Sequence, residues 1–461
     1  MSAPLSVVRL RLAILLTGAL LAGACARLPV PAPAPAPPAP RSPAGTPVPG
    51  PTPAPERPAA PEEPLSGEEP WITVGLAWDL SGVTIDPQGA AVVEGSSRHA
   101  LDRDDQLSVT MERGRGAVRA VGRGVSWSAR LAAGETLSVT PDAGTTIRWN
   151  EQQWRGQFRI FINPRGKLTL ATRLRLERYL DGVIPGEIGA LDEGVIEAGR
   201  AQAIAARSYT LFYRGRRAAE GFDVYATVED QLYVSVEGER PLASRCVEST
   251  AGEVALSNGR PVRANYCSTC GGITADVWEA WPADPLPYLV SHRDRPTDAD
   301  EGTAEDYCSA SRHFRWQEEW PAAELLSNLV EFCPPNGIPL PSSRLGALVD
   351  ARVESRSRSG RVWRLVVETT AGPVVIPAWS LRQVLRRPGN PRAILRSNLF
   401  KVDVRRDPRT DRALSLVASG AGSGHGVGLC QTGALGMARK GRNAKDILRH
   451  YYRGAEIKRL Y

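Results

Sequence analysis

Glu187 has neighbours that suit a carboxyl group to acid–base chemistry. It stands between Pro185-Gly186 and the apolar Ile188, just ahead of an alanine-rich segment. A carboxyl group among apolar neighbours ionises less readily than one in water, so its pKa rises and it can donate a proton at neutral pH. The alternative is a carboxylate in the first turn of a helix, where the helix dipole favours the charge.

His425 lies in the glycine-dense segment GHGVGLCQTGA (424–434), where no large side chain shields it from a ligand. A second interpretation pairs His425, as a base, with Cys430 as a thiol nucleophile. The sequence offers no clear orienting partner for the histidine, and a cysteine of an exported protein is more often bonded or buried. The thiol pair is therefore the weaker interpretation.

The segment TVEDQLY (227–233) carries polar groups that suit sugar recognition. If it is extended, alternate residues share a face, because successive side chains of a strand point to opposite sides. Amide and phenol groups on one face can bind sugar hydroxyl and N-acetyl groups, although an ordinary solvated strand has the same pattern. The residues on that face would be Thr227, Glu229, Gln231 and Tyr233.

Six cysteines follow residue 25, and two of them lie in the segment YCSTCGGIT (266–274), beside hydroxyl side chains and a double glycine. An even number of cysteines in an oxidising compartment favours disulfides, and we expect a bridge from Cys270 or Cys267 to Cys308. The alternative is half of a zinc site or a redox pair. We expect a structural role with no metal or cofactor. The candidate second ligands for zinc would be Cys308, His292 and Cys246.

Elements of both types must position these groups. Short β-prone runs from 71 to 150, separated by Gly, Pro and Asp, predict a mostly antiparallel β-rich region. A hairpin follows, with its turn at 163–166 between alternating apolar residues. Asp192 can cap a helix over 193–214, whose apolar residues repeat at three, four and seven positions.

The remaining segments contribute a second body and two short helices. The segment 310–405 contains a hairpin and a short helix near 379–387 but no site motif, so it is interpreted as an insertion in a main domain over 151–461. Gly441 and Asn443 end one helix and cap the last one. The whole is an α+β fold, mostly antiparallel β with a few helices lining a substrate groove.

The first residues predict export. Residues 1–24 have a basic start, an apolar run and small residues before Cys25, which is the pattern of a signal peptide. They resemble a bacterial lipoprotein signal with Cys25 as the lipidated residue; ordinary cleavage nearby is the alternative. Residues 25–70 contain a run rich in Pro and Ala, with 16 prolines from Pro29 to Pro64, which predicts a disordered, extended tether.

The net charge of the chain indicates which class of partner it can bind. A count of 57 Lys and Arg against 50 Asp and Glu gives a net charge of +7, which weakly favours an anionic partner. Outside the cytoplasm a cell-wall polymer or lipid headgroups fit better than nucleic acid. No apolar run of about 18 residues follows the signal, so no later membrane span is predicted.

Five segments in order resemble the stage II sporulation protein D family, which includes the amidase-enhancer proteins of bacterial cell walls. Each segment alone is a weak signal, but the ordered set covers about 280 residues and is specific. The segments are 176–188 (LERYLDGVIPGEI), 198–211 (AGRAQAIAARSYTL), 227–233, 265–278 (NYCSTCGGITADVW) with 287–289, and 424–441 followed by 447–457.

The resemblance implies a protein that acts on peptidoglycan. The family's sporulation members are lytic transglycosylases of peptide-stripped glycan, and Glu187 matches their catalytic glutamate. One carboxyl group can protonate the glycosidic oxygen and then help the C6 hydroxyl attack the anomeric carbon, which leaves a 1,6-anhydro end. Hydrolases usually need a second carboxylate. The residues implied to line the groove are Arg207, Tyr209, Gln231, Tyr233, Ser268, Thr269, His425 and Gln431.

The resemblance also leaves alternatives. The chain could be a non-catalytic, glycan-binding enhancer of a cell-wall amidase of the N-acetylmuramoyl-L-alanine type, held at the membrane by a lipid anchor. Some sporulation members bind zinc through His and Cys near the segment that matches 220–233. This chain has neither residue type there, so that metal site is not carried over.

Overall fold

The computed structural model describes residues 67–122, 125–296 and 305–461, all within one compact unit (42–461). The predicted signal peptide (1–24), Cys25 and nearly all of the tether (25–70) lie outside the described residues. In the described part of the chain no helix is long and apolar enough to cross a membrane. Strand residues outnumber helical ones and the sheets are mostly antiparallel, which confirms the α+β expectation.

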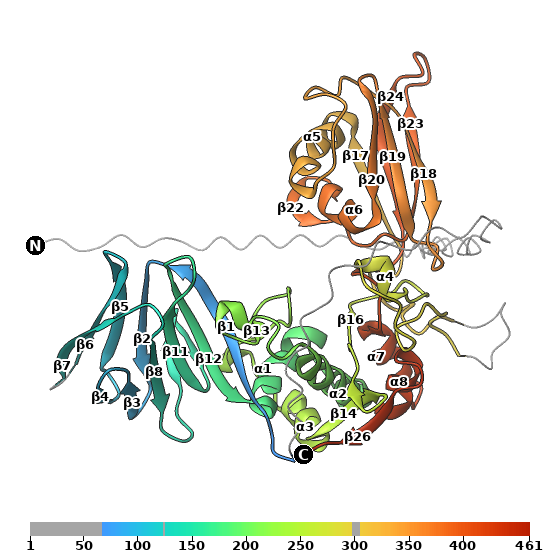
Figure 1. Ribbon diagram of the computed structural model, residues 1–461. Helices are drawn as coiled ribbons and strands as arrows, with labels where there is room; N and C mark the ends of the chain where they lie inside the picture. The colour runs from blue at the N-terminus through green and yellow to red at the C-terminus, as the bar shows by residue number, and fades with distance from the viewer. Residues whose placement is uncertain (1–66, 123–124, 297–304) are drawn as a thin grey trace, which may run out of the picture. The chain divides into compact units, whose positions relative to one another are not determined.

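The first twelve strands form two sheets around a shared apolar core (Figure 1). One sheet has the order β13-β1-β12-β11-β8-β3-β4 and the other β10-β9-β2-β5-β6-β7. Buried and exposed residues alternate along several of these strands, as expected for sheets with one solvated face. The strands are β1 (Trp71–Leu80), β2 (Gly82–Pro87), β3 (Ala91–Glu94), β4 (Arg98–Leu101), β5 (Gln106–Glu112), β6 (Arg115–Val121), β7 (Ser126–Leu131), β8 (Thr136–Pro141), β9 (Ile147–Trp149), β10 (Gln152–Trp154), β11 (Gln157–Ile162) and β12 (Leu168–Arg175).

The predicted hairpin is formed by β11 and β12. Gly166 has a φ of +71°, and its N–H donates to the Asn163 carbonyl over 2.9 Å, which closes the turn. Strand β12 then runs directly into helix α1 (Leu176–Ile188). The hairpin therefore fixes the start of the helix that carries Glu187.

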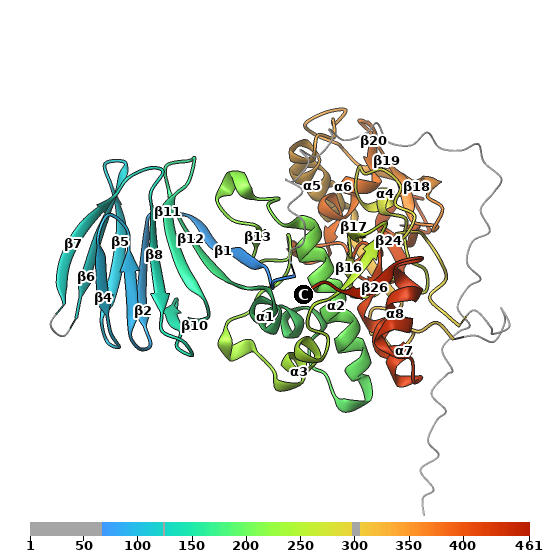
Figure 2. The same ribbon diagram turned by 60° about the horizontal axis from the view of Figure 1, so that its bottom comes forward.

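The helix α2 (Ile196–Tyr213), preceded by the 3-10 turn η1 (Glu193–Val195), confirms the predicted 193–214 helix. Its small residues let other helices approach closely, and it is buried on most of its surface. Figure 2 shows α2 between α1 and α3 (Pro241–Ser249) on one side and α7 (Gln431–Arg439) and α8 (Ala444–Tyr451) on the other. Asp192 precedes η1, although its side chain makes no capping hydrogen bond.

Parallel pairing of two short strands brings the two glycine-rich segments together. In β16 (Tyr266–Cys267) and β25 (Leu429–Cys430), Tyr266 pairs with Leu429 and Cys267 with Cys430. Helix α8 is capped as predicted, since Asn443 Oδ1 accepts from Asp446 N over 2.9 Å. The other elements of this body are η2 (Ala218–Glu220), β13 (Val224–Tyr225), η3 (Val236–Gly238), β14 (Glu253–Ser257), β15 (Arg260–Pro261), α4 (Val277–Ala280), α7 (Gln431–Arg439), α8 (Ala444–Tyr451) and β26 (Glu456–Arg459).

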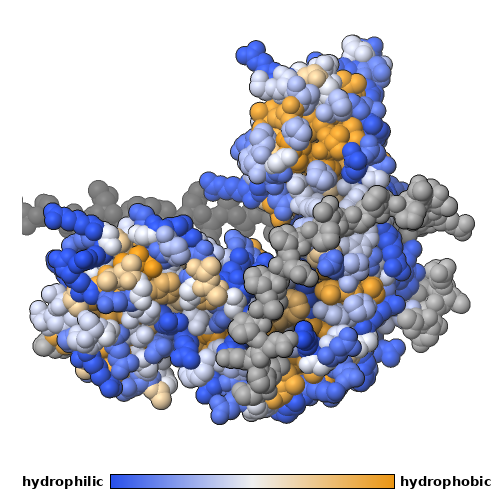
Figure 3. Space-filling view, in the orientation of Figure 1, coloured by the Kyte–Doolittle hydropathy of each residue, from blue (hydrophilic) through white to orange (hydrophobic). Residues whose placement is uncertain are grey.

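Residues 316–420, between α4 and β25, form a second body with a separate apolar core. This core includes the fully buried Trp320. The predicted helix near 379–387 is α6, which ends earlier, at Val384. In Figure 3 hydrophobic side chains gather on the visible face of this body. Its elements are β17 (Trp316–Pro321), α5 (Ala322–Phe332), η4 (Pro334–Asn336), β18 (Leu348–Arg356), β19 (Val362–Thr369), β20 (Gly372–Pro377), α6 (Ala378–Val384), β21 (Arg386–Arg387), β22 (Asn390–Ile394), β23 (Phe400–Arg406) and β24 (Ala413–Gly420).

Candidate functional site

Glu187 lies in the last turn of α1, with its carboxyl group against two loops from other parts of the chain. Its Oε1 accepts a hydrogen bond from Leu232 N over 2.7 Å. The side chains of Tyr266 and Gln431 also lie against the carboxyl group. The first-turn interpretation of Glu187 is wrong, because α1 begins at Leu176 and ends at Ile188. A dipole-stabilised carboxylate belongs at the opposite end of a helix.

Burial sets the acidity of Glu187. Loss of water around the carboxyl group raises its pKa to about 7, although hydrogen bonds from Leu232 N, Tyr266 and Gln431 lower it in part. The side chain nevertheless keeps partial exposure, so a ligand can reach it. Near neutral pH the group is therefore divided between its acid and base forms, which suits a residue that donates a proton and later takes one back.

Tyr266 is held against Glu187 by the fully buried side chain of Gln231. Gln231 Oε1 accepts from Thr210 Oγ1 over 2.7 Å and from Tyr179 Oη over 3.3 Å. Its Nε2 donates to Tyr266 Oη over 3.1 Å. Since Tyr266 Oη accepts that bond, its own proton can point at the Glu187 carboxylate. Gln231 thus lies behind the site and orients Tyr266.

Gln431 supplies an amide beside Glu187 from the first residue of α7. The side chain is 8% exposed, and its Nε2 has no hydrogen-bond partner of good geometry within the described residues. The amide is still near enough to Glu187 to lower the pKa of the carboxyl group. A buried donor without a partner is costly, so Gln431 Nε2 is a group that a bound ligand would satisfy.

His425 is a neutral imidazole at this site. Its Nδ1 accepts from Val427 N over 3.0 Å, and its ring lies tilted against Trp281 with centroids 4.7 Å apart. A hydrogen bond to the Tyr266 backbone holds it in place. Such a ring can contact a sugar but cannot act as an acid near pH 7. Burial lowers the pKa of His425 to about 3, and three cations add to the effect: Arg382, Arg263 and Arg361.

The geometry opposes a nucleophilic Cys430. The thiol is fully buried, and its Sγ accepts from Cys270 N over 3.2 Å and from Gly433 N over 3.3 Å. His425 Nδ1 is engaged with Val427 instead. All six cysteines of the described part of the chain have free thiols, so the expected bridge to Cys308 is not present.

Aromatic and cationic side chains surround the loops of the site. Tyr209 is nearly buried, with its ring centroid 6.1 Å from that of Tyr266 and 4.5 Å from that of Tyr213. The Arg263 guanidinium lies over the Trp281 ring, 4.8 Å from its centroid. Aromatic faces are common sugar-stacking surfaces. Sequence reasoning did not select Tyr266, Trp281 or Arg263, and only Tyr266 had a signal, its place at the start of the Cys-Ser-Thr-Cys segment.

Ser268 and Thr269 form the loop that meets α7. Thr269 Oγ1 lies 2.9 Å from Ser311 Oγ and accepts from Thr432 Oγ1 over 3.0 Å. The Ser268 carbonyl accepts from Thr432 N over 3.1 Å. Ser268 remains partly exposed, whereas Thr269 is buried. This pair therefore fixes the approach of the loop to Gln431.

Arg207 and Tyr233 lie in the interior. Arg207 is fully buried and binds Glu177 with two nitrogens, over 2.8 and 2.6 Å. Tyr233 packs on Tyr179 with centroids 5.2 Å apart. The extended face expected for 227–233 is wrong over its first half, because Asp230 N donates to the Thr227 carbonyl over 3.0 Å and closes a turn.

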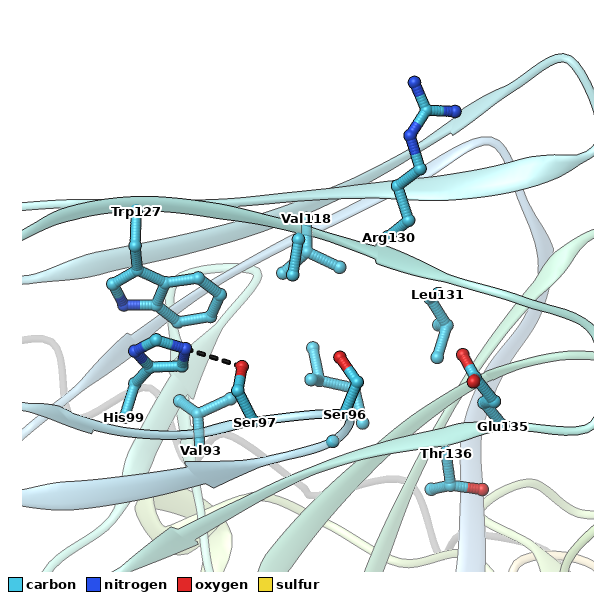
Figure 4. A pocket seen from close by; sticks show the side chains of 13 residues that line it. Val93, Ser96, Ser97, His99, Val118, Trp127, Arg130, Leu131, Glu135 and Thr136 are labelled. Carbon is cyan, nitrogen blue, oxygen red and sulfur yellow. Dashed lines mark hydrogen bonds between the residues drawn. The ribbon is translucent and has the colours of Figure 1, made fainter.

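A separate hollow of about 220 Å³ lies in the N-terminal sheets (Figure 4). There His99 and Trp127 stack with centroids 4.0 Å apart, and Ser97 Oγ lies 2.7 Å from His99 Nε2. None of the residues selected from the sequence lines this hollow. The candidate site is therefore the region around Glu187.

The segment that carries Glu187 is similar to known proteins. Residues 164–256 match the family described as stage II sporulation protein, and residues 275–428 match a domain of unknown function (DUF8618). An uncharacterized protein of Brachyspira hyodysenteriae is 27% identical over 304 residues, which cover 65% of this chain and 70% of that protein. Stage II sporulation protein D of Bacillus subtilis is 26% identical over 297 residues, 61% of this chain and 74% of the relative.

The amidase enhancer of Bacillus subtilis is 25% identical over 301 residues, which cover 60% of this chain but only 40% of that protein. The matched segment 164–256 contains Glu187, Gln231 and the helices that position them. Residues 164–256 of this chain are therefore similar to the stage II sporulation protein family, and the chain resembles sporulation protein D and the amidase enhancer over about 300 residues.

Proposed function

We propose that the protein is a peptidoglycan lytic transglycosylase that cleaves peptide-stripped glycan strands to 1,6-anhydro-muramic acid ends, with Glu187 as general acid and base. The observation that carries the proposal is a single, partly exposed carboxyl group with a pKa raised to about 7 by burial. Similarity to the stage II sporulation protein family and to a sporulation protein D supports a peptidoglycan-related role in the cell envelope.

The reaction needs one proton to move out and back. Protonated Glu187 donates its proton to the glycosidic oxygen as the bond from that oxygen to the anomeric carbon breaks, and the far chain leaves as an alcohol. The N–H of Leu232 and the hydroxyl of Tyr266 then stabilise the carboxylate. The sugar's C6 hydroxyl attacks the anomeric carbon and returns its proton to Glu187, so no water or cofactor is consumed.

The surroundings of Glu187 suit this one-carboxyl mechanism. The described groups that move its pKa are an N–H, a phenol and an amide, with no second carboxylate among them. Hydrolysis of glycosides usually needs two carboxyl groups at a fixed separation. Neutral His425 and the amide of Gln431, whose Nε2 makes no well-aligned hydrogen bond within the described residues, would bind the sugar beside the reacting bond.

The test is digestion of peptide-free glycan strands with mass spectrometry of the products. The wild-type chain should yield 1,6-anhydro ends, and Glu187→Gln should lower the rate at least about 100-fold. Glu229→Gln is the matched control, because Glu229 is exposed in the neighbouring turn. Full activity of Glu187→Gln, or products with reducing ends only, would contradict the proposal.

A second function is favoured by the relative named amidase enhancer. On this alternative the chain binds glycan and stimulates an amidase of the N-acetylmuramoyl-L-alanine type without cutting glycan itself. Glu187→Gln would then retain both glycan binding and amidase stimulation. Assaying the same variant with and without an amidase separates the two functions.

A lipid anchor at Cys25 is part of the proposal, since it would attach the enzyme to the membrane within reach of the cell wall. Cys25→Ser should move the protein from the membrane fraction to the soluble envelope fraction of the producing cells. Unchanged partition between the two fractions would remove the anchor from the proposal and leave the catalytic part intact.

A further inference from the structure

Four buried side chains with metal-binding atoms meet behind the parallel pair β16 and β25. They are Cys270, Asp294, Cys308 and Cys430, and the ligand atoms, one from each, all lie within 4.8 Å of one another. All four residues are fully buried. A carboxylate and three thiols held together away from water are costly unless a cation binds them.

The separations fit a tetrahedral site. Cys270 Sγ lies 3.7 Å from Cys308 Sγ and 3.1 Å from Asp294 Oδ2. Sulfur ligands at about 2.3 Å from a tetrahedral zinc ion are about 3.8 Å apart, which is close to the observed pair. A disulfide would require the same two sulfurs at about 2.0 Å and would leave Asp294 and Cys430 without a role.

The surrounding groups hold these side chains as they would hold metal ligands. Asp294 Oδ1 accepts from Tyr451 Oη over 2.8 Å and lies 3.3 Å from His450 Nε2, which leaves Oδ2 facing the thiols. Two backbone N–H groups point at Cys430 Sγ, from Cys270 and Gly433. In zinc sites, hydrogen bonds of this kind orient the side chains that bind the metal directly.

Glycine is required at the edge of the cluster. A Cβ at Gly433 would lie 2.1 Å from Tyr451 Oη and 2.6 Å from Asp294 Oδ2. Gly271, next to Cys270, has a φ of +81°, which lets the chain turn sharply after that thiol. The backbone is thus shaped around the four side chains, which come from segments up to 160 residues apart.

We propose that Cys270, Asp294, Cys308 and Cys430 bind a structural Zn²⁺ ion. Thiolate ligands select zinc over the harder cations Mg²⁺ and Ca²⁺, and four protein ligands in a closed, buried site leave no open position for catalysis. This assignment replaces the expectations of a disulfide from Cys270 or Cys267 to Cys308 and of a chain without metal. It does not depend on the proposed glycan reaction.

The position of the ion indicates that it would join distant segments of the chain. Cys308 precedes β17 and Cys430 follows β24, so the ion joins the two ends of the body formed by 316–420. Cys430 is also bonded in sequence to Gln431, whose amide lies beside Glu187. Zinc would therefore fix the insertion and the α7 end of the candidate site at once.

The first test is the metal content of the full chain, purified without chelators and dialysed. The wild type should retain about one zinc ion per chain, and Cys308→Ser or Cys430→Ser should lower this at least about tenfold. Cys246→Ser and Cys333→Ser are matched controls, because both are buried free cysteines outside the cluster and should retain the ion. Equal zinc in all variants, or a wild type that stays free of zinc after zinc is added, would overturn the proposal.

The second test stays valid if the cysteine variants do not fold. Co²⁺ exchanged into the wild-type chain should give the intense visible bands of a tetrahedral site and a sulfur-to-cobalt charge-transfer band. Asp294→Asn should keep the charge-transfer band but bind Co²⁺ at least about tenfold more weakly. A pale octahedral spectrum, or a Cys270–Cys308 disulfide found in the unreduced chain by mass spectrometry, would refute the site.

Discussion

At the residue scale the properties of Glu187 follow from what surrounds it. Its proton affinity is set by loss of water, and three donors oppose that effect without cancelling it. A residue in this position can be poised near neutral pH without a charged partner. The pH dependence of the reaction is the direct consequence.

The activity should follow the protonated fraction of Glu187. With a pKa of about 7 in place of the ordinary 4.5, the rate should be level below pH 6 and fall about tenfold per pH unit above 7. The measurement is the initial rate of glycan cleavage from pH 5 to 9. A fall centred near 4.5 would mean that burial does not control this carboxyl group.

Tyr266→Phe should move this profile and lower its maximum. The Tyr266 hydroxyl lowers the pKa of Glu187, so its loss should shift the falling limb upward by about 0.5–1 pH unit. The rate maximum should drop about 10- to 100-fold, because the carboxylate loses a donor. Tyr452→Phe is the control, since that buried hydroxyl donates to the Asn265 carbonyl instead. An unchanged pH profile in Tyr266→Phe would show that the Tyr266 ring packs at the site but that its hydroxyl does not stabilise the Glu187 carboxylate.

Glu187 should also cost the protein stability at high pH. The unfolded carboxyl group loses its proton near 4.5 and the folded one near 7, so wild-type stability falls as pH rises between these values. Glu187→Gln escapes this loss and should be more stable by about 2–3 kcal/mol at pH 8, with little difference at pH 4. Urea denaturation at both pH values measures this. A pH-independent difference, such as Glu229→Gln should show, would count against it.

The sequence pointed to part of the candidate site, to Glu187 and His425 through their neighbours and to Gln431 only through the family resemblance. Glu187, Gln431 and His425 were selected from the sequence, and the structure groups them around Tyr266. Tyr266 itself was not selected, because its position depends on the pairing of β16 with β25, more than 160 residues away in the chain. Gln231 was read as exposed, but a turn at 227–230 carries it into the interior.

At the element scale, α1 and α2 are joined by one buried ion pair. Arg207 on α2 binds Glu177 on α1, and the carboxylate also accepts from Gly252 N over 3.2 Å and Tyr461 Oη over 2.6 Å. The pair therefore connects both helices to the loop before β14 and to the C-terminal residue. Such a charge is strongly destabilising when it loses its partner.

Arg207→Met should destabilise the protein by about 3–5 kcal/mol, because Glu177 would remain partly buried without its cation. The double variant Arg207→Met/Glu177→Gln should recover part of that loss. Chemical denaturation gives the free energies of unfolding. If Arg207→Met instead kept full stability and raised only the KM for glycan, Arg207 would be a substrate-binding residue as the family resemblance implied.

The elements with strong local signals were predictable and those set by distant contacts were not. The β11–β12 hairpin, α2 and the Asn443-capped α8 each have a periodic pattern and a capping or turn residue. Helix α1 was missed as the element that carries Glu187, since its Pro185 and Gly186 are typical of a helix end and are here inside its last turn. Burial against its neighbours outweighs that local preference.

At the scale of the whole molecule, the 316–420 body is tied to the main body through Glu279 and Arg361. Glu279 at α4 accepts from Ser357 Oγ over 2.7 Å and from Ser359 N over 3.2 Å. Arg361 Nη2 donates back to the carbonyls of Cys270 and Ile273, both over 3.1 Å. The bonds of Arg361 therefore hold the loop that carries Cys270. The Arg361 guanidinium also lies against Gly426, the residue next to His425.

Glu279→Ala should loosen the 316–420 body before the rest of the protein. The change removes the carboxylate that accepts from Ser357 Oγ and Ser359 N and whose charge acts on the buried Arg361, which should cost about 3–5 kcal/mol. Hydrogen exchange should then speed up at least about tenfold at amides of β18, β19 and β20 and stay unchanged in β5 and β6, because the lost bonds belong to one body. Glu354→Ala removes only an exposed pair with Arg364 and should change neither region. Equal acceleration in all five strands would mean that the two bodies unfold as one unit, with Glu279 no more than a buried group of the common core.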